Sequence, residues 1–334
     1  MIAASPRPRQ RTDWQEQLAD AVTDPVTLCR LLGLDPARAG AAASDFPLRV
    51  PLAYVARMRR GDYADPLLRQ VLSTAAELLP ASGYGADPLQ ESQAQRGGGL
   101  LQKYAHRVLL ITTGACAVHC RYCFRREFPY GETLGEGARW QAALATIAAD
   151  SSIEEVILSG GDPLSLSNAR LTQLLQQLAT IPHVQRLRIH TRQPVVLPAR
   201  VDDGLCELLQ RQARPVVVVL HVNHANEIDA EVRAACVHLR ASGVVLLNQA
   251  VLLAGVNDSV AALLALSHAL WSASVLPYYL HLLDHVRGTS HFDVPEVRAR
   301  ALHAALQSVL PGYLLPRLVR EVPGSASKTL IAGS

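Results

Sequence analysis

Lysine is the charged residue that this 334-residue chain uses least: of its 32 basic residues only Lys103 and Lys328 are lysines. Arginine supplies charge and hydrogen bonds, but its permanently protonated guanidinium does not form an imine with a carbonyl compound. A lysine kept in such a background is therefore a candidate for a role that needs a primary amine. Without further context, however, the better interpretation of Lys328 is a solvated lysine in the terminal segment "EVPGSASKTLIAGS".

Other absences argue against whole classes of protein. The net charge is only +3 and the arginines are dispersed, so we expect no nucleic acid partner. The first twenty residues turn from basic to acidic without an apolar stretch, so we expect a cytoplasmic protein. No Asp, Glu, Lys or Arg occurs between Ser259 and Leu283, but Pro277 and several serines interrupt this segment. We expect a buried helix and a strand there, and no membrane contact.

The apolar pattern changes near residue 105. Before it, stretches such as "DWQEQLADAVTDPVTLCRLLGL" and "DPLLRQVLSTAAELLP" have a helical period and predict an N-terminal helical region over 1–104. After it, nearly continuous runs of Val, Ile and Leu alternate with helix-length segments. These runs span 107–113, 155–161, 186–191, 215–222, 244–253 and 276–284.

Strands that are buried on both faces have this composition, and the alternation predicts an α/β chain with an open, parallel (β/α)6 barrel over 105–312. The remaining segment, 313–334, predicts a final strand and a loop that carries Lys328. A Rossmann sheet is the competing architecture, but no G-x-G-x-x-G follows the first predicted strand.

Three of the six cysteines lie within eight residues, in "GACAVHCRYCFRR" directly after the first predicted strand. Cys116, Cys120 and Cys123 have a C-x3-C-x2-C spacing, which can supply three thiolates and leave one coordination position open. This pattern favours a [4Fe-4S] cluster with one open iron. Structural zinc is the alternative, but it needs four ligands, and His119 is poorly placed between two of the cysteines to be the fourth.

This cysteine motif, with an aromatic residue before its last cysteine, resembles the signature of radical S-adenosylmethionine enzymes. In that family the open iron binds the methionine part of S-adenosylmethionine, which is cleaved to a 5′-deoxyadenosyl radical. The second predicted strand ends in "SGGDP", which is similar to the family's glycine-rich motif; there, glycines give room for the methionine amino group. The resemblance implies these S-adenosylmethionine contacts: Ser159, Gly160, Gly161 and Asp162, with His221 and Gln249 as further candidates that could instead merely line the barrel.

Longer stretches resemble lysine 2,3-aminomutases. The segments "KYAHRVLLITTGACAVHCRYCFRR", "RIHTRQPVVLPARV", "HVNHANEI", "NQAVLLAGVNDS" and "PGSASK" occur in the family's order between about residues 100 and 330. Members of that family also use pyridoxal 5′-phosphate (PLP), held as an imine on a lysine in a glycine-rich loop, and Lys328 occupies this place. The resemblance implies an isomerase in which the radical takes hydrogen from the β-carbon of lysine and the PLP-bound amino group migrates there.

The resemblance also implies binding roles. Arg125 matches an arginine that pairs with the substrate carboxylate; an arginine that supports the cluster loop is the alternative. Asp284 matches an aspartate that binds the distal ammonium of lysine, although a helix cap would be the better interpretation without the resemblance. Glu321 stands where the family has a second such aspartate, seven residues before the PLP lysine. Three further residues match positions near PLP and its phosphate: Lys103, Tyr104 and Arg107.

Only six residues follow Lys328, whereas longer lysine aminomutases continue into a zinc-binding domain. The short form resembles bacterial enzymes that make (R)-β-lysine for elongation factor P, upstream of a ligase related to lysyl-tRNA synthetase. We therefore expect L-lysine as substrate and flavodoxin or ferredoxin as electron donor. The alternatives are an aminomutase for arginine or for glutamate, which Asp284 and Glu321 would repel, and a non-catalytic metal-binding module of the translation apparatus.

Overall fold

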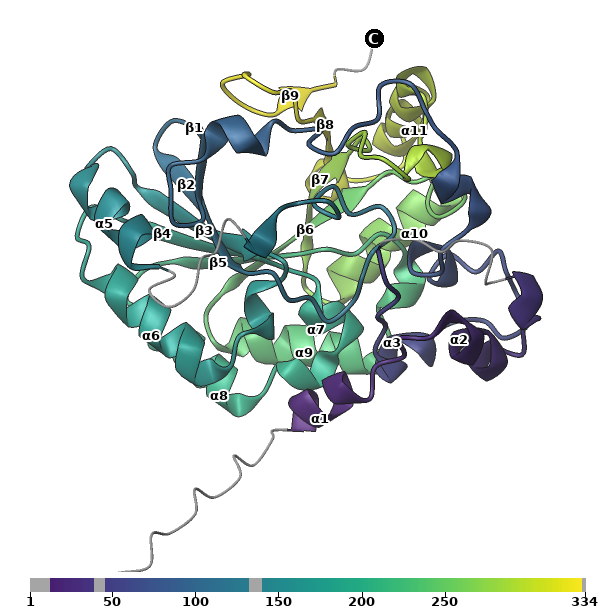
Figure 1. The fold of residues 1–334 in the computed structure, drawn as a ribbon, viewed down its shortest axis with the longest axis horizontal. Coiled ribbons are helices and arrows are strands. Elements are labelled where there is room, and N and C mark those ends of the chain that lie inside the picture. The colour runs from purple at the N-terminus through teal and green to yellow at the C-terminus, as the bar shows by residue number, and fades with distance from the viewer. Residues whose placement is uncertain (1–12, 39–45, 132–139, 332–334) are drawn as a thin grey trace, which may run out of the picture.

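A nine-stranded sheet dominates the computed structural model, which describes residues 13–38, 46–131 and 140–331 (Figure 1). The strands follow one another in the sheet in chain order, and those from β2 to β8 are parallel. β1 and β9 are antiparallel to their neighbours at the two edges. The bounds are β1 Leu100–Tyr104, β2 Arg107–Thr113, β3 Glu155–Gly160, β4 Arg186–Thr191, β5 Val216–Leu220, β6 Val245–Val251, β7 Leu276–His281, β8 Arg317–Arg320 and β9 Thr329–Leu330.

The six predicted strands correspond to β2 through β7. The edge strands β1 and β9 are not paired with each other in the described part of the chain, so the curved sheet stays open. The predicted partial (β/α)6 barrel is therefore confirmed.

Helices connect the parallel strands and cover the outer face of the sheet (Figure 1). Four of them begin at a side-chain cap: an oxygen of Ser167, Asp202, Asp229 or Ser259 accepts a hydrogen bond from a backbone N–H of the first turn. Such residues satisfy N–H groups that have no partner inside the helix. The helices are α5 Gln141–Ala149, α6 Asn168–Ala179, α7 Gln193–Val196, α8 Asp203–Gln210, α9 Ala230–Ala241, α10 Val260–Ser272 and α11 Glu296–Gln307.

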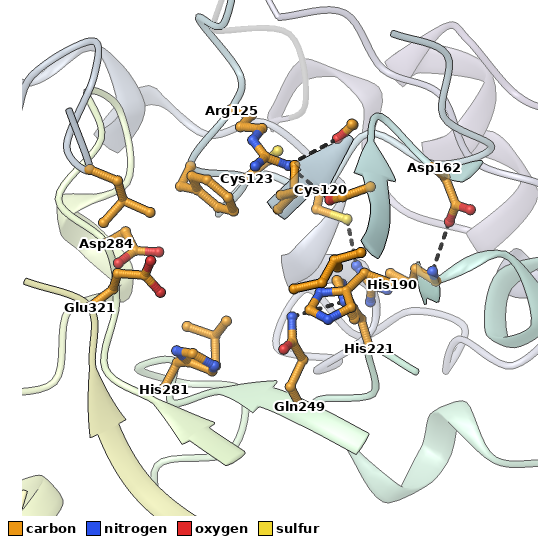
Figure 2. Close-up of a pocket in the computed structure, with 18 of the residues that line it drawn as sticks. Cys120, Cys123, Arg125, Asp162, His190, His221, Gln249, His281, Asp284 and Glu321 are labelled. Atoms are coloured by element: carbon orange, nitrogen blue, oxygen red, sulfur yellow. Dashed lines mark hydrogen bonds between the residues drawn. The ribbon is translucent and has the colours of Figure 1, made fainter. Parts of the chain in front are cut away.

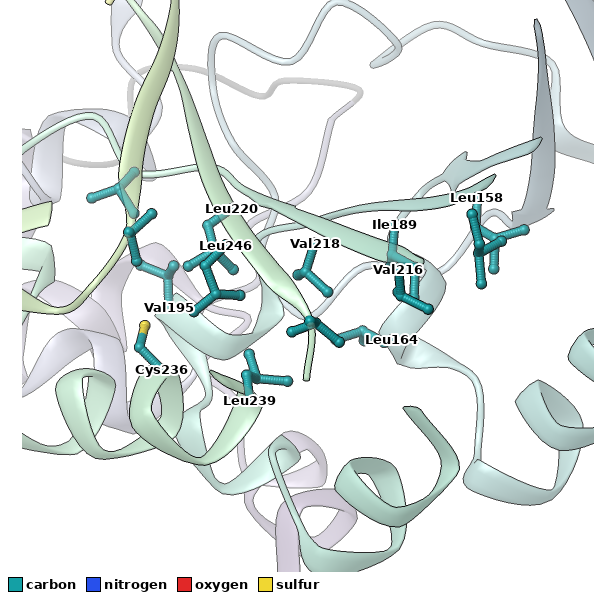
Figure 3. Packing of buried hydrophobic residues seen from close by; sticks show 14 of the residues in the cluster. Leu158, Leu164, Ile189, Val195, Val216, Val218, Leu220, Cys236, Leu239 and Leu246 are labelled. Atoms are coloured by element: carbon teal, nitrogen blue, oxygen red, sulfur yellow. The ribbon is translucent and has the colours of Figure 1, made fainter. Parts of the chain in front are cut away.

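The main hydrophobic core lies between this helical layer and the sheet (Figure 3). Ile189, Val218 and Leu246 point outward from three neighbouring strands, and Cys236 and Leu239 meet them from α9. Because this packing fixes the strands, the loops at their carboxyl ends start from rigid positions.

The uncharged segment between Ser259 and Leu283 forms a helix and a strand, α10 and β7, as the sequence predicts. α10 packs on β7 and α11. Of the helices that the structure describes, none has the length and apolar character needed to span a membrane.

The N-terminal region is helical only in part. Its α-helices are short: α1 Asp13–Ala19, α2 Pro25–Leu32 and α3 Leu52–Val55. The predicted helix over 65–80 is wrong, since that stretch contains only the 3-10 turns Leu68–Gln70 and Ala75–Leu78. Thr74 is extended between the two turns, where it caps the second one, and Glu77 binds Arg121 and Arg126 of the cysteine loop. These ion pairs override the helical period.

The C-terminal segment belongs to the sheet. β8 extends the parallel sheet beside β7, and β9 folds back antiparallel on β8. Glu321 directly follows β8 and Lys328 directly precedes β9, so the two residues stand at the two ends of one hairpin loop. This topology brings Lys328 to the carboxyl ends of the parallel strands and not into a solvated tail.

Candidate active site

One cavity of about 570 Å³ opens at the carboxyl ends of the strands. Every residue to which the sequence analysis gave a chemical role lines this cavity. They are Cys116, Cys120, Cys123, Arg125, Lys103, Tyr104, Arg107, Ser159, Gly160, Gly161, Asp162, His221, Gln249, Asp284, Glu321 and Lys328. Figure 2 shows Cys120, Cys123 and Arg125 on one side, with Asp284 and Glu321 across the cavity from them.

The three cysteines lie on the loop after β2, and none of them is in a disulfide. Burial raises the pKa of Cys116 well above its usual range, and burial together with Cys120 raises the pKa of Cys123 to about 11. No three His, Cys, Asp or Glu side chains among the described residues gather closely enough to ligate one metal ion. The three thiolates of a [4Fe-4S] cluster can stand farther apart than the ligands of a single metal ion, since each cysteine binds a different iron atom. The donor set fits such a cluster.

Arg192, which directly follows β4, binds the cysteine loop through Cys120. Its Nη1 donates to Cys120 Sγ at 2.7 Å, and its Nη2 donates to Gln70 Oε1 at 2.7 Å and to Glu227 Oε2 at 2.9 Å. The guanidinium is buried, and Nη2 also contacts the hydroxyl of Tyr54 at 3.0 Å. Arg192 could not be predicted from the sequence, because its partners come from four separate stretches of the chain that no local pattern connects.

The glycine-rich segment supports the cysteine loop. Gly161 N donates to Thr113 O at 2.7 Å, and Asp162 N donates to Ala115 O at 2.8 Å. A Cβ at Gly160 would lie 2.5 Å from Thr113 O at the end of β2, and one at Gly161 would lie 2.4 Å from Ala115 O of the cysteine loop. Gly160 also has φ of +118°. The structure therefore gives a different reason for these glycines than the sequence analysis did: they allow β3 to pack on the cysteine loop.

The carboxylate of Asp162 is also used inside the protein. It accepts hydrogen bonds from the Thr191 hydroxyl at 2.7 Å and from the backbone N–H of Arg192 at 2.7 Å and Gln193 at 3.0 Å. Asp162 thus fixes the end of β4, from which Arg192 reaches Cys120.

Arg125 is engaged by a carboxylate that the sequence analysis overlooked. Its Nε and Nη2 donate to the two oxygens of Glu91 at 2.7 and 2.8 Å, and its Nη1 donates to Ser159 Oγ at 3.0 Å. Lys103 Nζ lies 3.2 Å from Glu91 and 3.4 Å from Glu321, which in turn binds Lys328. Opposite charges therefore alternate along a chain from Arg125 to Lys328.

We expect Glu91→Gln to lower the free energy of unfolding by about 3–5 kcal/mol, because it leaves the buried guanidinium of Arg125 without its carboxylate. Glu91 and Arg125 are only 4% and 5% exposed. Urea unfolding of the purified protein measures this change. Glu154→Gln is the matched control, since its pair with Arg186 is exposed and should contribute no more than about 1 kcal/mol. Equal losses in the two variants would contradict the structural importance of Glu91.

A row of imidazoles and one amide lines the floor of the cavity (Figure 2). Gln249 Nε2 and His221 Nε2 are 2.9 Å apart. The buried Nε2 atoms of His190 and His281 have no hydrogen-bond partner within the described ranges. Burial lowers the pKa of His221 and His281 to about 3, so both rings are neutral at ordinary pH. Neutral imidazoles can donate to or accept from a polar ligand without adding charge.

The far end of the cavity combines cations and carboxylates. Burial opposes ionisation of Glu321, but Lys328 and Lys103 outweigh it and lower its pKa to about 2. Burial, followed by the charge of Glu321, raises the pKa of Asp284 to about 7. The Asp284 carboxylate makes no hydrogen bond or ion pair with any residue that the structure describes.

Two arginines can serve an anionic group at this end. Arg107 stacks on the Tyr104 ring with Cζ 4.7 Å from its centre, and Arg317 lines the cavity from β8. Neither forms an ion pair within the described ranges. With the amine of Lys328 in the same cavity, the residues present fit an aldehyde cofactor that carries a phosphate.

The chain is similar to one family model, to several curated proteins and to solved structures. A family model described as a 4Fe-4S single cluster domain matches residues 102–186. L-lysine 2,3-aminomutase of Escherichia coli is 50% identical over 323 residues, which are 96% of this chain and 94% of the relative. The Haemophilus influenzae enzyme of that name is 46% identical over 99% of both chains, and that of Clostridium subterminale is 35% identical over 95% of this chain and 77% of its own. Among solved structures, Streptococcus suis SuiB bound to S-adenosylmethionine aligns with 66% of this chain and 51% of its own, at 13% identity and a TM-score of 0.49.

Proposed function

Because the chain belongs to the lysine 2,3-aminomutase family, we propose that it is an isomerase that converts L-lysine into (R)-β-lysine. The observation that carries this proposal is the shared cavity: the three cysteines and the amine of Lys328 face the same space. A radical source and an amine-binding aldehyde can act on one substrate only if they meet in this way.

We propose three cofactors for this cavity. Cys116, Cys120 and Cys123 would hold a [4Fe-4S] cluster, which with S-adenosylmethionine supplies a 5′-deoxyadenosyl radical. Lys328 would hold PLP, which supplies an imine through which nitrogen can migrate. The backbone at Gly160, together with Ser159 and the His221–Gln249 pair, would bind S-adenosylmethionine, while the cofactor phosphate would lie against Arg107, Tyr104 and Lys103.

The charges at the two ends of the cavity suit a diamino acid. Arg125 would bind the substrate carboxylate from the cysteine side, with Glu91 fixing the plane of its guanidinium. The acidic pair of Asp284 and Glu321 lies across the cavity, where the distal ammonium of lysine would need a carboxylate. A glutamate side chain would be repelled there.

We expect the KM for lysine to rise about ten-fold for each pH unit below pH 7. The cause is Asp284, whose pKa of about 7 leaves the carboxyl protonated below that pH. Only the ionised carboxylate of Asp284 attracts the distal ammonium of lysine. Below pH 7 the Asp284 carboxyl must therefore lose its proton before lysine can bind, whereas above pH 7 it is already ionised. Steady-state kinetics between about pH 6 and pH 8 measure this effect. Asp284→Asn should raise the KM at every pH and flatten the profile; an unchanged profile in that variant would exclude Asp284 as the titrating group.

The proposed reaction can be tested with anaerobically reconstituted protein. Incubation with L-lysine, S-adenosylmethionine, PLP and a reductant should give β-lysine, identified by chromatography against both enantiomers. L-Arginine and L-glutamate in parallel reactions test the alternative substrates. A protein loaded with both cluster and PLP that makes no β-lysine would refute the proposal.

We further propose that a ligase related to lysyl-tRNA synthetase attaches the product to elongation factor P. The enzyme itself would be cytoplasmic and would receive electrons from flavodoxin or ferredoxin. The six unpaired cysteines support a reducing compartment. Deleting the gene should remove the β-lysyl mass increment from elongation factor P, and an unchanged mass would contradict this assignment.

A further inference from the structure

Glu321 is surrounded by donors of the protein itself. Lys328 Nζ donates to its Oε2, Lys103 Nζ lies 3.4 Å from its Oε1, and the nearby Tyr104 hydroxyl also helps to lower the pKa of this carboxylate. Both lysines of the chain therefore contact one side chain. Its side chain is 13% exposed, so little of it is left for another ligand.

Asp284 is in the opposite situation. It lines the same end of the cavity, and its carboxylate has no hydrogen-bond or ion-pair partner in the described part of the chain. Asp284 is half-buried. A carboxylate that is withdrawn from solvent without a partner is unfavourable as an anion, so an arriving cation gains most by binding there. The two acidic residues are thus not equivalent, although both face the same space.

We propose that Glu321 is a positioning residue that binds the ammonium of Lys328 whenever this amine is not attached to PLP, and that Asp284 binds the distal ammonium of the substrate. This division rests on the proposed function and refines it. The hairpin loop explains why Glu321 suits this role, because Glu321 and Lys328 stand at its two ends, where β8 and β9 hold them together.

The contact matters at the step in which the substrate replaces Lys328 on the cofactor. With PLP bound, the C=N bond to Lys328 would break as a C=N bond to the substrate nitrogen forms. Two protons of the incoming ammonium would pass to the lysine nitrogen, so Lys328 would leave as an ammonium. A carboxylate that receives this ammonium shifts the exchange toward the substrate-bound cofactor.

L-Norleucine separates the two roles because it has the chain length of lysine but no distal ammonium. The experiment incubates PLP-loaded protein with saturating norleucine, reduces it with borohydride and measures by mass spectrometry how much PLP is on Lys328 and how much on norleucine. We expect Glu321→Gln to lower the ratio of norleucine-bound to Lys328-bound PLP about ten-fold or more. Glu321→Asp, which keeps the charge but is one methylene shorter, should retain more of the wild-type ratio than Glu321→Gln.

Asp284→Asn is the matched control, and it should leave the norleucine ratio unchanged while weakening lysine binding. If Glu321 instead serves the distal ammonium, Glu321→Gln and Glu321→Asp will leave the norleucine ratio at the wild-type value, which would overturn the proposal. Failure of the proposed function is a separate result: in that case the wild-type protein shows no reduced PLP on Lys328 even before norleucine is added.

Discussion

Replacing Lys328 by arginine should abolish covalent attachment of PLP and lower β-lysine formation by about 10³-fold or more. Arginine keeps a positive charge beside Glu321, so the ion pair that closes the hairpin loop can persist. It cannot form the imine. Without that bond the cofactor is no longer held at a high effective concentration against the substrate, which is the main advantage of a covalent carrier.

The measurement combines borohydride reduction with peptide mass spectrometry and a product assay. Wild-type protein should carry reduced PLP on the peptide that contains Lys328, and Lys328→Arg should carry none while keeping its iron content. Lys103→Arg is the matched control, because it changes the only other lysine and should keep the adduct at Lys328. Reduced PLP on Lys103 in the wild-type protein would refute the assignment.

Removing any one cysteine of the loop should lower product formation more than Lys328→Arg does, because it eliminates the radical source. We expect Cys120→Ala to lower the iron content after reconstitution and to reduce product formation to background, a loss of at least about 10⁶-fold if the acceleration is typical of enzymes. Cys120 is the informative choice because Arg192 holds its sulfur. The PLP adduct at Lys328 should survive, since the hydrogen bonds and ion pairs of Lys328 and Glu321 within the described ranges do not involve a cysteine.

The remaining cysteines provide the controls for this prediction. Cys29, Cys206 and Cys236 are buried in the hydrophobic cores and do not line the cavity. Alanine at any of these positions should retain full iron loading and the characteristic brown colour. If Cys120→Ala keeps the iron of the wild-type protein, the cluster assignment fails.

The barrel could be predicted from the sequence because its signal is local. Most of the six strands are rich in Val, Ile and Leu, although β4 also contains arginine and β7 proline and tyrosine, and β2 through β7 lie within the predicted runs. The helix predicted over 65–80 does not form, because the helical period of this stretch competes with ion pairs to residues far away in the sequence. Glu77 must reach Arg121 and Arg126, and Thr74 adopts an extended conformation to allow this.

The candidate site was predictable only as far as motifs extend. Cys116, Cys120, Cys123 and Lys328 stand in recognisable local patterns, and the structure brings all four to one cavity. Glu91 and Arg192 carry no such pattern. Glu91 begins a short 3-10 turn, Glu91–Ala94, before β1, and its importance appears only when the fold places it against Arg125 and Lys103. Only the tertiary structure identifies side chains that support reactive residues but lie far from them in the sequence.

The most direct test of the shared cavity follows a hydrogen atom. Reconstituted protein is given L-lysine deuterated at the β-carbon, and 5′-deoxyadenosine and β-lysine are analysed by mass spectrometry after limited turnover. If the cysteine loop and Lys328 serve one substrate, deuterium from the lysine must appear in 5′-deoxyadenosine. 5′-Deoxyadenosine that forms without any deuterium, while β-lysine accumulates, would contradict the account.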